Sequence, residues 1–155
     1  MITKLSEKVQ ERKRFTKKLQ KVVAEIANRI VSIYNEEAAV VVDGRTVKVR
    51  RKSSNVGSYL HLAVEEWDGR FGVIDDSREP GSWFYLHNDF NVTIRIAEKE
   101  TYVWFANHVK EIVEAFIKLE DKRISELKTA LENAKLQIDD ILNDQNTQKN
   151  ELPKH

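Results

Sequence analysis

The chain has 155 residues, of which 33% are charged, and its formal net charge at pH 7 is +1. This length suits one domain with a single core of moderate size. The chain has no cysteine, which excludes disulfides, thiolate nucleophiles and cysteine-ligated zinc. No apolar run approaches the roughly 20 residues that span a bilayer, so we expect a cytoplasmic protein with no membrane partner.

The small net charge hides an uneven distribution. Residues 1–55 hold 14 Lys and Arg against 6 Asp and Glu (+8), whereas residues 56–155 hold 12 against 19 (−7). A split of this kind is typical of proteins that bind nucleic acid or another anionic surface. It also occurs when a basic helix pairs with an acidic helix in the same molecule, so that alternative stays open.

The first predicted element is a helix from about Thr3 to Asn35, because helix formers dominate this segment and neither Gly nor Pro interrupts it. Its first half is basic, and its second half, from Val22 to Ile33, is apolar enough to pack on a larger surface. The 3-4 spacing typical of a coiled-coil seam runs through Ile2, Leu5, Val9, Arg12, Thr16, Leu19, Val23, Ile26, Ile30 and Ile33.

The next segment predicts a hairpin of Ala38–Val42 and Arg45–Lys52, joined by the two-residue turn Asp43-Gly44. A two-residue turn places Val40 opposite Val47, so apolar side chains face apolar side chains across the pair. The pattern therefore predicts both the strands and their register.

A second hairpin is predicted from Tyr59–Trp67 and Arg70–Asp75, again with a two-residue turn, Asp68-Gly69. The same rule places Val64 opposite Val73. One face would then be apolar, with Leu60, Leu62, Val64, Phe71 and Val73. A third hairpin is predicted from Trp83–His87 and Phe90–Ala97, with its turn near Asn88-Asp89.

From about Lys99 the apolar spacing is helical again. Apolar residues between Tyr102 and Leu119 cover too wide an arc for a two-helix seam, so we expect this part to lie across the sheet. Beyond Glu120 the apolar positions narrow to a second 3-4 seam that ends near Leu142. This seam consists of Ile117, Ile124, Leu127, Leu131, Ala134, Ile138 and Ile141.

These elements predict an α+β fold, an antiparallel six-stranded meander flanked by a long N-terminal and a long C-terminal helix on one face of the sheet. We expect a single domain over residues 1–145, with a projecting helical arm at about 1–21 and 120–142 that pairs as a coiled coil. Residues 146–155 are polar and are expected to form a disordered tail. Because one helix covers this seam poorly, we also expect a homo-oligomer, a dimer or higher.

The basic residues are the most specific functional signal. Alternate residues of one predicted strand, together with the first helix, could contact phosphates of nucleic acid. The predicted nucleic-acid-binding residues are Lys13, Arg14, Lys17, Lys18, Arg45, Lys48, Arg50, Arg51 and Lys52. Two alternatives remain: the strand cations could prevent strand addition at a sheet edge, and the helix cations could pair with Glu114, Glu120 and Asp121.

Catalytic signals are weak, because the chain has no Gly-x-Ser-x-Gly motif, phosphate-binding loop or dinucleotide motif. His108 and Glu111 have a metal-binding spacing, but a site needs three or four ligands. The sequence favours a non-enzymatic binding or assembly module that oligomerises through its helices, contacts an anionic partner such as nucleic acid and needs no cofactor. The alternative is a small divalent-metal-dependent nuclease that uses carboxylates near residues 65–79.

Overall fold

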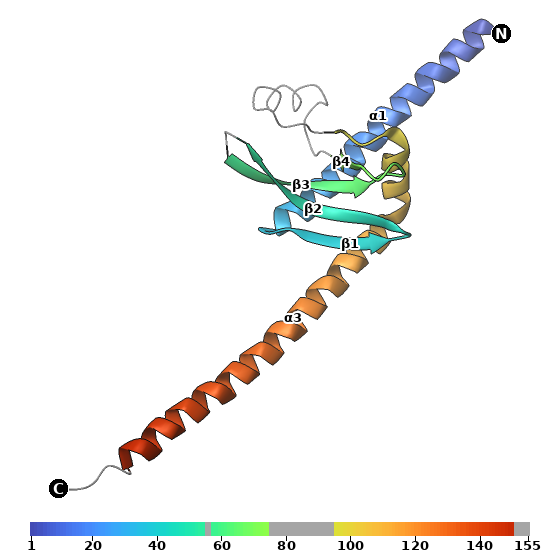
Figure 1. The fold of residues 1–155 in the computed structure, drawn as a ribbon. Helices are drawn as coiled ribbons and strands as arrows, with labels where there is room; N and C mark the ends of the chain where they lie inside the picture. The colour runs from blue at the N-terminus through green and yellow to red at the C-terminus, as the bar shows by residue number, and fades with distance from the viewer. Residues whose placement is uncertain (55–56, 75–94, 151–155) are drawn as a thin grey trace. The chain divides into compact units, whose positions relative to one another are not determined.

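The computed structural model describes residues 1–54, 57–74 and 95–150. Within these ranges the chain forms two helices and a four-stranded antiparallel sheet (Figure 1). The elements are α1 (Ile2–Ile33), β1 (Ala38–Val42), β2 (Arg45–Ser54), β3 (Gly57–Glu65), β4 (Phe71–Ile74) and α3 (Lys99–Asn150). Two compact units divide the chain, Met1–Phe116 and Ile117–His155, and each is described by itself.

α1 confirms the predicted first helix, but its two halves differ in burial. Side chains of the second half form one buried stripe at helical spacing, Val23, Ala24, Ala27 and Ile30. In the first half Ile2 is 84% exposed and Leu5 is 64% exposed. The helix ends where Tyr34 adopts an extended conformation and packs its ring on Phe116, with 5.6 Å between the ring centroids.

The β1–β2 hairpin has the predicted register. Val40 lies opposite Val47, and Ala38 lies opposite Val49. The turn residue Asp43 has φ 48° and the following glycine has φ 73°. Positive φ at both turn residues is the requirement of a type I′ turn, which an Asp-Gly pair meets at little cost.

The β3–β4 hairpin differs from the prediction by one residue. Ala63, and not Val64, lies opposite Val73. The turn is one residue longer than expected, because Glu66 N–H donates to the Arg70 carbonyl at 2.8 Å and three residues lie between them. Gly69 takes the left-handed position of this three-residue loop. A shift of one residue reverses the faces, so Phe71 and Val73 lie on the face opposite Leu62.

The predicted six-stranded meander is wrong, because the described sheet has four strands. Trp83–His87 lies outside the described residues, as does most of Phe90–Ala97. Where the chain is described again, Ile96 forms a single parallel bridge with Val73, whereas a meander would run antiparallel to β4. Parallel neighbours need a connection of about a dozen residues or more, and residues 75–94 provide that length.

One face of the sheet carries most of the core. Two buried rows cross all four strands, Ala38–Val49–Leu62–Ile74 and Val40–Val47–Val64–Gly72. α1 crosses behind the sheet, and the first turns of α3 stand at the end where the β1–β2 turn lies (Figure 1). That part of α3 buries one stripe, Thr101, Tyr102, Phe105, Ile112 and Phe116. On the opposite face Ala63 and Val73 are fully buried under Tyr59 and Phe71.

The second unit, from Ile117 onward, has no core of its own. It is helical through Asn150, and none of its described side chains, residues 117–147, is buried. No helix in the described ranges is both long and apolar enough to cross a membrane.

Candidate functional site

The first half of α1 presents a group of exposed cations, including four of the predicted nucleic-acid-binding residues. Lys13, Arg14, Lys17 and Lys18 are all exposed, and among the described residues none of them has an ion-pair partner. Phe15 lies between them and is 56% exposed. The Arg14 guanidinium and the Lys18 ammonium each lie 5.6 Å from its ring centroid. This half of the helix therefore offers both positive charge and an aromatic ring to solvent.

An open depression lies beside these cations and reaches the start of α3. Its lining is basic and polar, with Gln10, Arg12, Lys13, Arg14, Thr16, Lys17, Gln20 and Lys99. Two acids that were expected to pair with α1 have partners within α3. Glu114 lies 4.0 Å from Lys110, and Glu120 lies 3.3 Å from Arg123. The depression thus gathers cations that a polyanion could neutralise.

Lys48 and Arg50 occupy the sheet face opposite α1, where both cover Phe71. The Lys48 ammonium lies 4.8 Å from the ring centroid and the Arg50 guanidinium 5.3 Å. Arg50 Nε also donates to His61 Nε2 at 3.0 Å. Burial lowers the pKa of Arg50, against the raising effect of the Glu37 carboxylate. These two cations stabilise the sheet, and a phosphate would have to compete for them.

Arg51 does not join this pair. Arg51 points to the other face, where its Nη2 donates to the Asn35 carbonyl and its backbone N–H donates to Glu37 Oε1, both at 2.9 Å. These bonds fix the segment between α1 and β1. Lys52 lies on β2, but its side chain lies outside the described part of the chain. The predicted residues with described side chains therefore form an exposed helical group and a dispersed strand group.

Arg45 is enclosed by aromatic rings at the β1–β2 turn. Its guanidinium lies 5.8 Å from the Trp67 ring and 5.1 Å from the Trp104 ring. Arg45 Nη1 and Trp104 Nε1 are both buried and have no hydrogen-bond partner among the described residues. The sequence analysis did not predict this stack, because Trp67 and Trp104 come from a turn and a distant helix. Through this stack Arg45 helps to hold α3 against the sheet.

His108 extends this cluster to the turn itself. Its ring stacks on Trp104 with 4.7 Å between centroids. Nδ1 lies 2.7 Å from the Trp104 carbonyl oxygen, and Nε2 lies 3.3 Å from Asp43 Oδ2. Both neighbours are acceptors, so both contacts are favourable only when the imidazole carries two protons. His108 thus links α3 to the β1–β2 turn.

Glu66, one of the carboxylates of the alternative nuclease hypothesis, holds the start of α3. Glu66 is buried after β3, and its Oε2 accepts hydrogen bonds from the Glu98 backbone N–H at 3.1 Å and from the Thr101 hydroxyl. A carboxylate at this position satisfies free N–H groups of a helix N-terminus and interacts favourably with its dipole. Gly72 is required beside it, because a Cβ there would lie 2.6 Å from the Ala97 Cα and overlap the Glu66 carboxylate.

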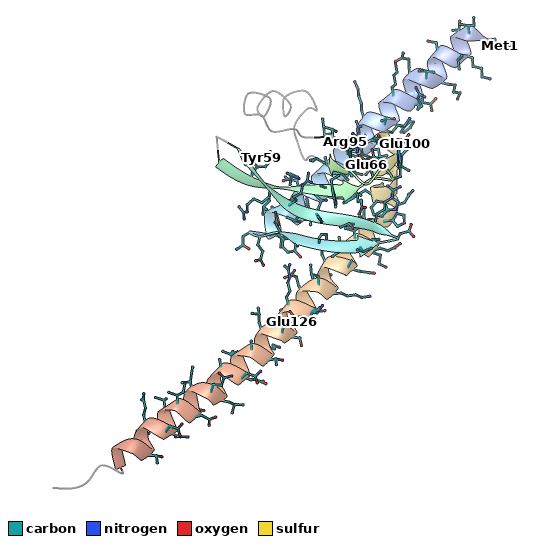
Figure 2. The ribbon with its side chains drawn as sticks, in the orientation of Figure 1. Met1, Tyr59, Glu66, Arg95, Glu100 and Glu126 are labelled. Atoms are coloured by element: carbon teal, nitrogen blue, oxygen red, sulfur yellow. The ribbon has the colours of Figure 1, made fainter. Side chains whose placement is uncertain are left out.

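Arg95 connects this carboxylate to its neighbours. Figure 2 labels Arg95 and Glu66 near Glu100 at the start of α3. Its guanidinium lies 3.5 Å from Glu66, 3.1 Å from Asp68 and 2.9 Å from Glu98. The Arg70 backbone N–H and then the Arg95 side chain lower the pKa of Asp68 to about 2. The sequence analysis missed Arg95, whose only signal was a charge within an apolar alternation.

This network gives Glu66 and Asp68 a structural role. Among the described residues no group of three or more His, Asp and Glu side chains could hold a metal ion. Asp75, Asp76 and Glu79, the other acids considered for catalysis, lie outside the described ranges.

The chain has no significant match among protein-family models, curated proteins or solved structures.

Proposed function

We propose that this protein is an assembly module that self-associates through the distal half of α3 and binds an anionic partner through the basic half of α1. The exposed seam of the second unit carries the first part of this proposal. Ile124 is 49% exposed, Leu127 70%, Leu131 56% and Ile138 55%. Helices without tertiary packing are marginal in water, so this segment needs apolar cover that its own unit does not supply.

The composition of the seam favours a partner helix as that cover. In heptad terms its a positions are Ile117, Ile124, Leu131 and Ile138, and its d positions after Glu120 are Leu127, Ala134 and Ile141. Three of the four a positions are isoleucine and Leu127 occupies a d position, a combination that favours two-stranded coiled coils where it repeats. A second copy of the chain can supply the same seam, so a dimer is the simplest assembly.

Light scattering coupled to size exclusion tests the assembly. The parent should elute with at least twice the chain mass of 18.1 kDa, whereas Leu127→Asp combined with Leu131→Asp should elute as a monomer. Ser125→Asp combined with Thr129→Asp adds the same charge outside the a and d positions and should leave the mass unchanged. A parent that stays monomeric at high micromolar concentration would refute self-association.

The exposed cations of α1 support the second part of the proposal. Eight Lys and Arg stand against two Glu in residues 1–21, and the depression beside them places Lys99 of α3 with Arg12, Lys13 and Lys17. A surface of this charge attracts polyanions with little sequence preference, because it contacts phosphates and not bases. Nucleic acid is the polyanion that we propose.

Titration of single- and double-stranded oligonucleotides at several salt concentrations tests this contact. Binding should weaken steeply with salt, and Lys17→Ala should lower the slope of log K against log salt by about one unit. Lys122→Ala, an exposed cation of the second unit, is the matched control and should leave the slope unchanged. Absence of binding at low salt would refute the nucleic-acid contact while leaving the assembly intact.

A further inference from the structure

β1 is an outer strand of the described sheet, and its own sequence has none of the features that usually protect such an edge. The strand order is β1-β2-β3-β4, so among the described strands β1 pairs only with β2. Its sequence, Ala38–Val42, contains five small or branched apolar residues and no charge or proline. Edge strands usually carry a charge, a proline or a bulge that blocks the addition of another strand. β1 has none of the three, and its register with β2 is regular.

The register shows which backbone groups face outward. In a hairpin with a two-residue turn, the residues that flank the turn form a hydrogen-bonded pair, and such pairs then alternate along the strands. Ala38, Val40 and Val42 therefore bond to β2, while the N–H and C=O groups of Ala39 and Val41 point away from the sheet. None of the described residues forms a hydrogen bond with these outward groups.

The side chains of β1 are also unusual for an outer strand. Val41 is 66% exposed and Ala39 is exposed beside it. On the neighbouring strand the same face carries Lys48 and Arg50. A strand that is apolar on both faces is typical of a position covered on both sides. The outer strand thus has the composition of an inner one.

The charges that flank β1 indicate which kind of strand could pair with its free edge. Exposed carboxylates stand at both ends of β1, Glu36 and Glu37 before it and Asp43 after it. Glu37 also accepts the Arg51 backbone N–H, and Asp43 also lies 3.3 Å from His108, so a partner would share these carboxylates. If two copies paired antiparallel with Ala39 opposite Val41, Glu37 of each copy would lie opposite Asp43 of the other. Like charges directly opposite each other destabilise a strand pair. A strand with basic residues at both ends would instead complement the edge.

We infer that the free edge of β1 is a docking site for an extended segment of another protein, with alternating apolar residues and Lys or Arg at both ends. The segment adds to the sheet as a further strand next to β1. Its main chain bonds to Ala39 and Val41, which provides affinity, and its basic ends face the carboxylates, which provides selectivity. This surface shares no residue with the α3 seam or with the α1 cations.

Two synthetic peptides test the site on the full-length protein by fluorescence polarisation. Both contain the core Val-Thr-Val-Thr-Val, one flanked by two lysines at each end and the other by two glutamates. The lysine-flanked peptide should bind at least about tenfold more tightly. Equal binding of the two peptides, or no binding of either, overturns the proposal.

Variants at Val41 distinguish backbone pairing at the β1 edge from nonspecific electrostatic attraction of the lysine-flanked peptide. Val41→Pro removes an outward N–H without breaking a β1–β2 bond, and proline is tolerated on edge strands, so binding should fall about tenfold or more. Val41→Lys gives a second readout if the proline variant fails to fold. Its control is Thr46→Lys, which adds the same charge at the cross-strand neighbour of Val41 and should retain most of the binding.

The outcomes on these variants decide the occupant. Unchanged peptide binding by a folded Val41→Pro or Val41→Lys protein overturns the docking site. If Val41→Lys instead converts a parent dimer to a monomer, the edge pairs with a second copy and the proposal of a different protein is wrong. Loss of the dimer on substitution of Leu127 and Leu131 bears only on the α3 seam.

Discussion

Residues 1–116 and the unit that begins at Ile117 use the same apolar spacing, but only the first buries it within the chain. In α1 the side chains of Val23 and Ala27 are 1% and 0% exposed, because they lie against a sheet. In the second unit Ile124 and Leu127 are 49% and 70% exposed. The same 3-4 repeat thus serves a helix packed on a sheet and a helix with no partner in its own unit. The repeat identifies a helix whose apolar side chains must be buried, but it does not identify the surface that buries them.

α1 itself contains the same contrast within one helix. Its buried positions begin at Val23, whereas Leu5 and Phe15 in the first half remain exposed. Arg12 and Thr16 interrupt the seam between these parts. The first half therefore has cations and an aromatic ring available for a partner, and the second half contributes to the stability of the fold.

The largest expected effect on stability distinguishes residues 1–116, which have a buried core, from the unit that begins at Ile117. Phe105→Ala should lower the free energy of unfolding by about 3–5 kcal/mol, because the ring is fully buried and its removal leaves a cavity. Leu136→Ala, at a 64% exposed position outside the a and d seam, should change it by less than about 0.5 kcal/mol. Urea unfolding followed by tryptophan fluorescence measures both. Similar losses for the two variants would show that the second unit also has a core.

The next effect tests the network that joins the sheet to α3. Glu66→Gln should cost about 1–3 kcal/mol, because an amide N–H₂ would face the Arg95 guanidinium and both groups are donors. Glu65→Gln, the adjacent and partly exposed carboxylate, is the matched control and should cost less than about 0.5 kcal/mol. Neither variant should alter the oligomer mass. A dimer lost with Glu66→Gln would contradict the independence of the two units.

A smaller effect should follow pH. The pKa of Asp68 in the folded protein is about 2, below its usual 3.8, so the folded state favours the charged carboxylate. Its contribution to stability is complete above pH 3.8 and is lost as the pH falls through about 2. Asp68→Asn should therefore lose less stability than the parent between pH 5 and pH 2 in thermal unfolding. Parallel acid profiles of the two proteins would show that Asp68 has no such role.

The smallest effect concerns the contact between His108 and Asp43. Asp43→Asn retains a residue that accepts positive φ and should cost less than about 1 kcal/mol, because the Asp43 side chain is 67% exposed. Melting temperatures of the parent and the variant at one pH measure this cost. A cost above about 2 kcal/mol would contradict the small contribution expected of an exposed ion pair.

The two hairpins show how far local sequence determines strand pairing. Asp43-Gly44 specifies a two-residue turn, and the predicted register of β1 and β2 is confirmed. Asp68-Gly69 has the same letters, yet the loop between Glu66 and Arg70 contains three residues. With the two-residue loop Glu66 could not make the bonds to α3 that it makes here. Those bonds come from residues more than thirty positions away, and no local pattern contains them.

The candidate site also differs between its helix cations and its strand cations in how far local sequence determines their surroundings. The sequence analysis left two alternatives for Lys13, Arg14, Lys17 and Lys18, contact with an anionic partner or pairing with acids of the second helix. All four are exposed, and none has an ion-pair partner among the described residues. The contacts of the strand cations could not be predicted from the local sequence pattern. Alternation placed Lys48 and Arg50 on one face, but their stacking on Phe71 depends on the register of β4, which the sequence analysis had reversed.

The sequence by itself determined the two helices, the first hairpin and the distribution of charge, because periodicity, turn residues and ionisable groups act over a few neighbouring positions. Only the tertiary structure decided the sheet of four described strands, the parallel bridge at Ile96 and the network around Glu66. These features join segments that are distant in the chain. Their free energy depends on burial and on partners that exist only after the chain has folded.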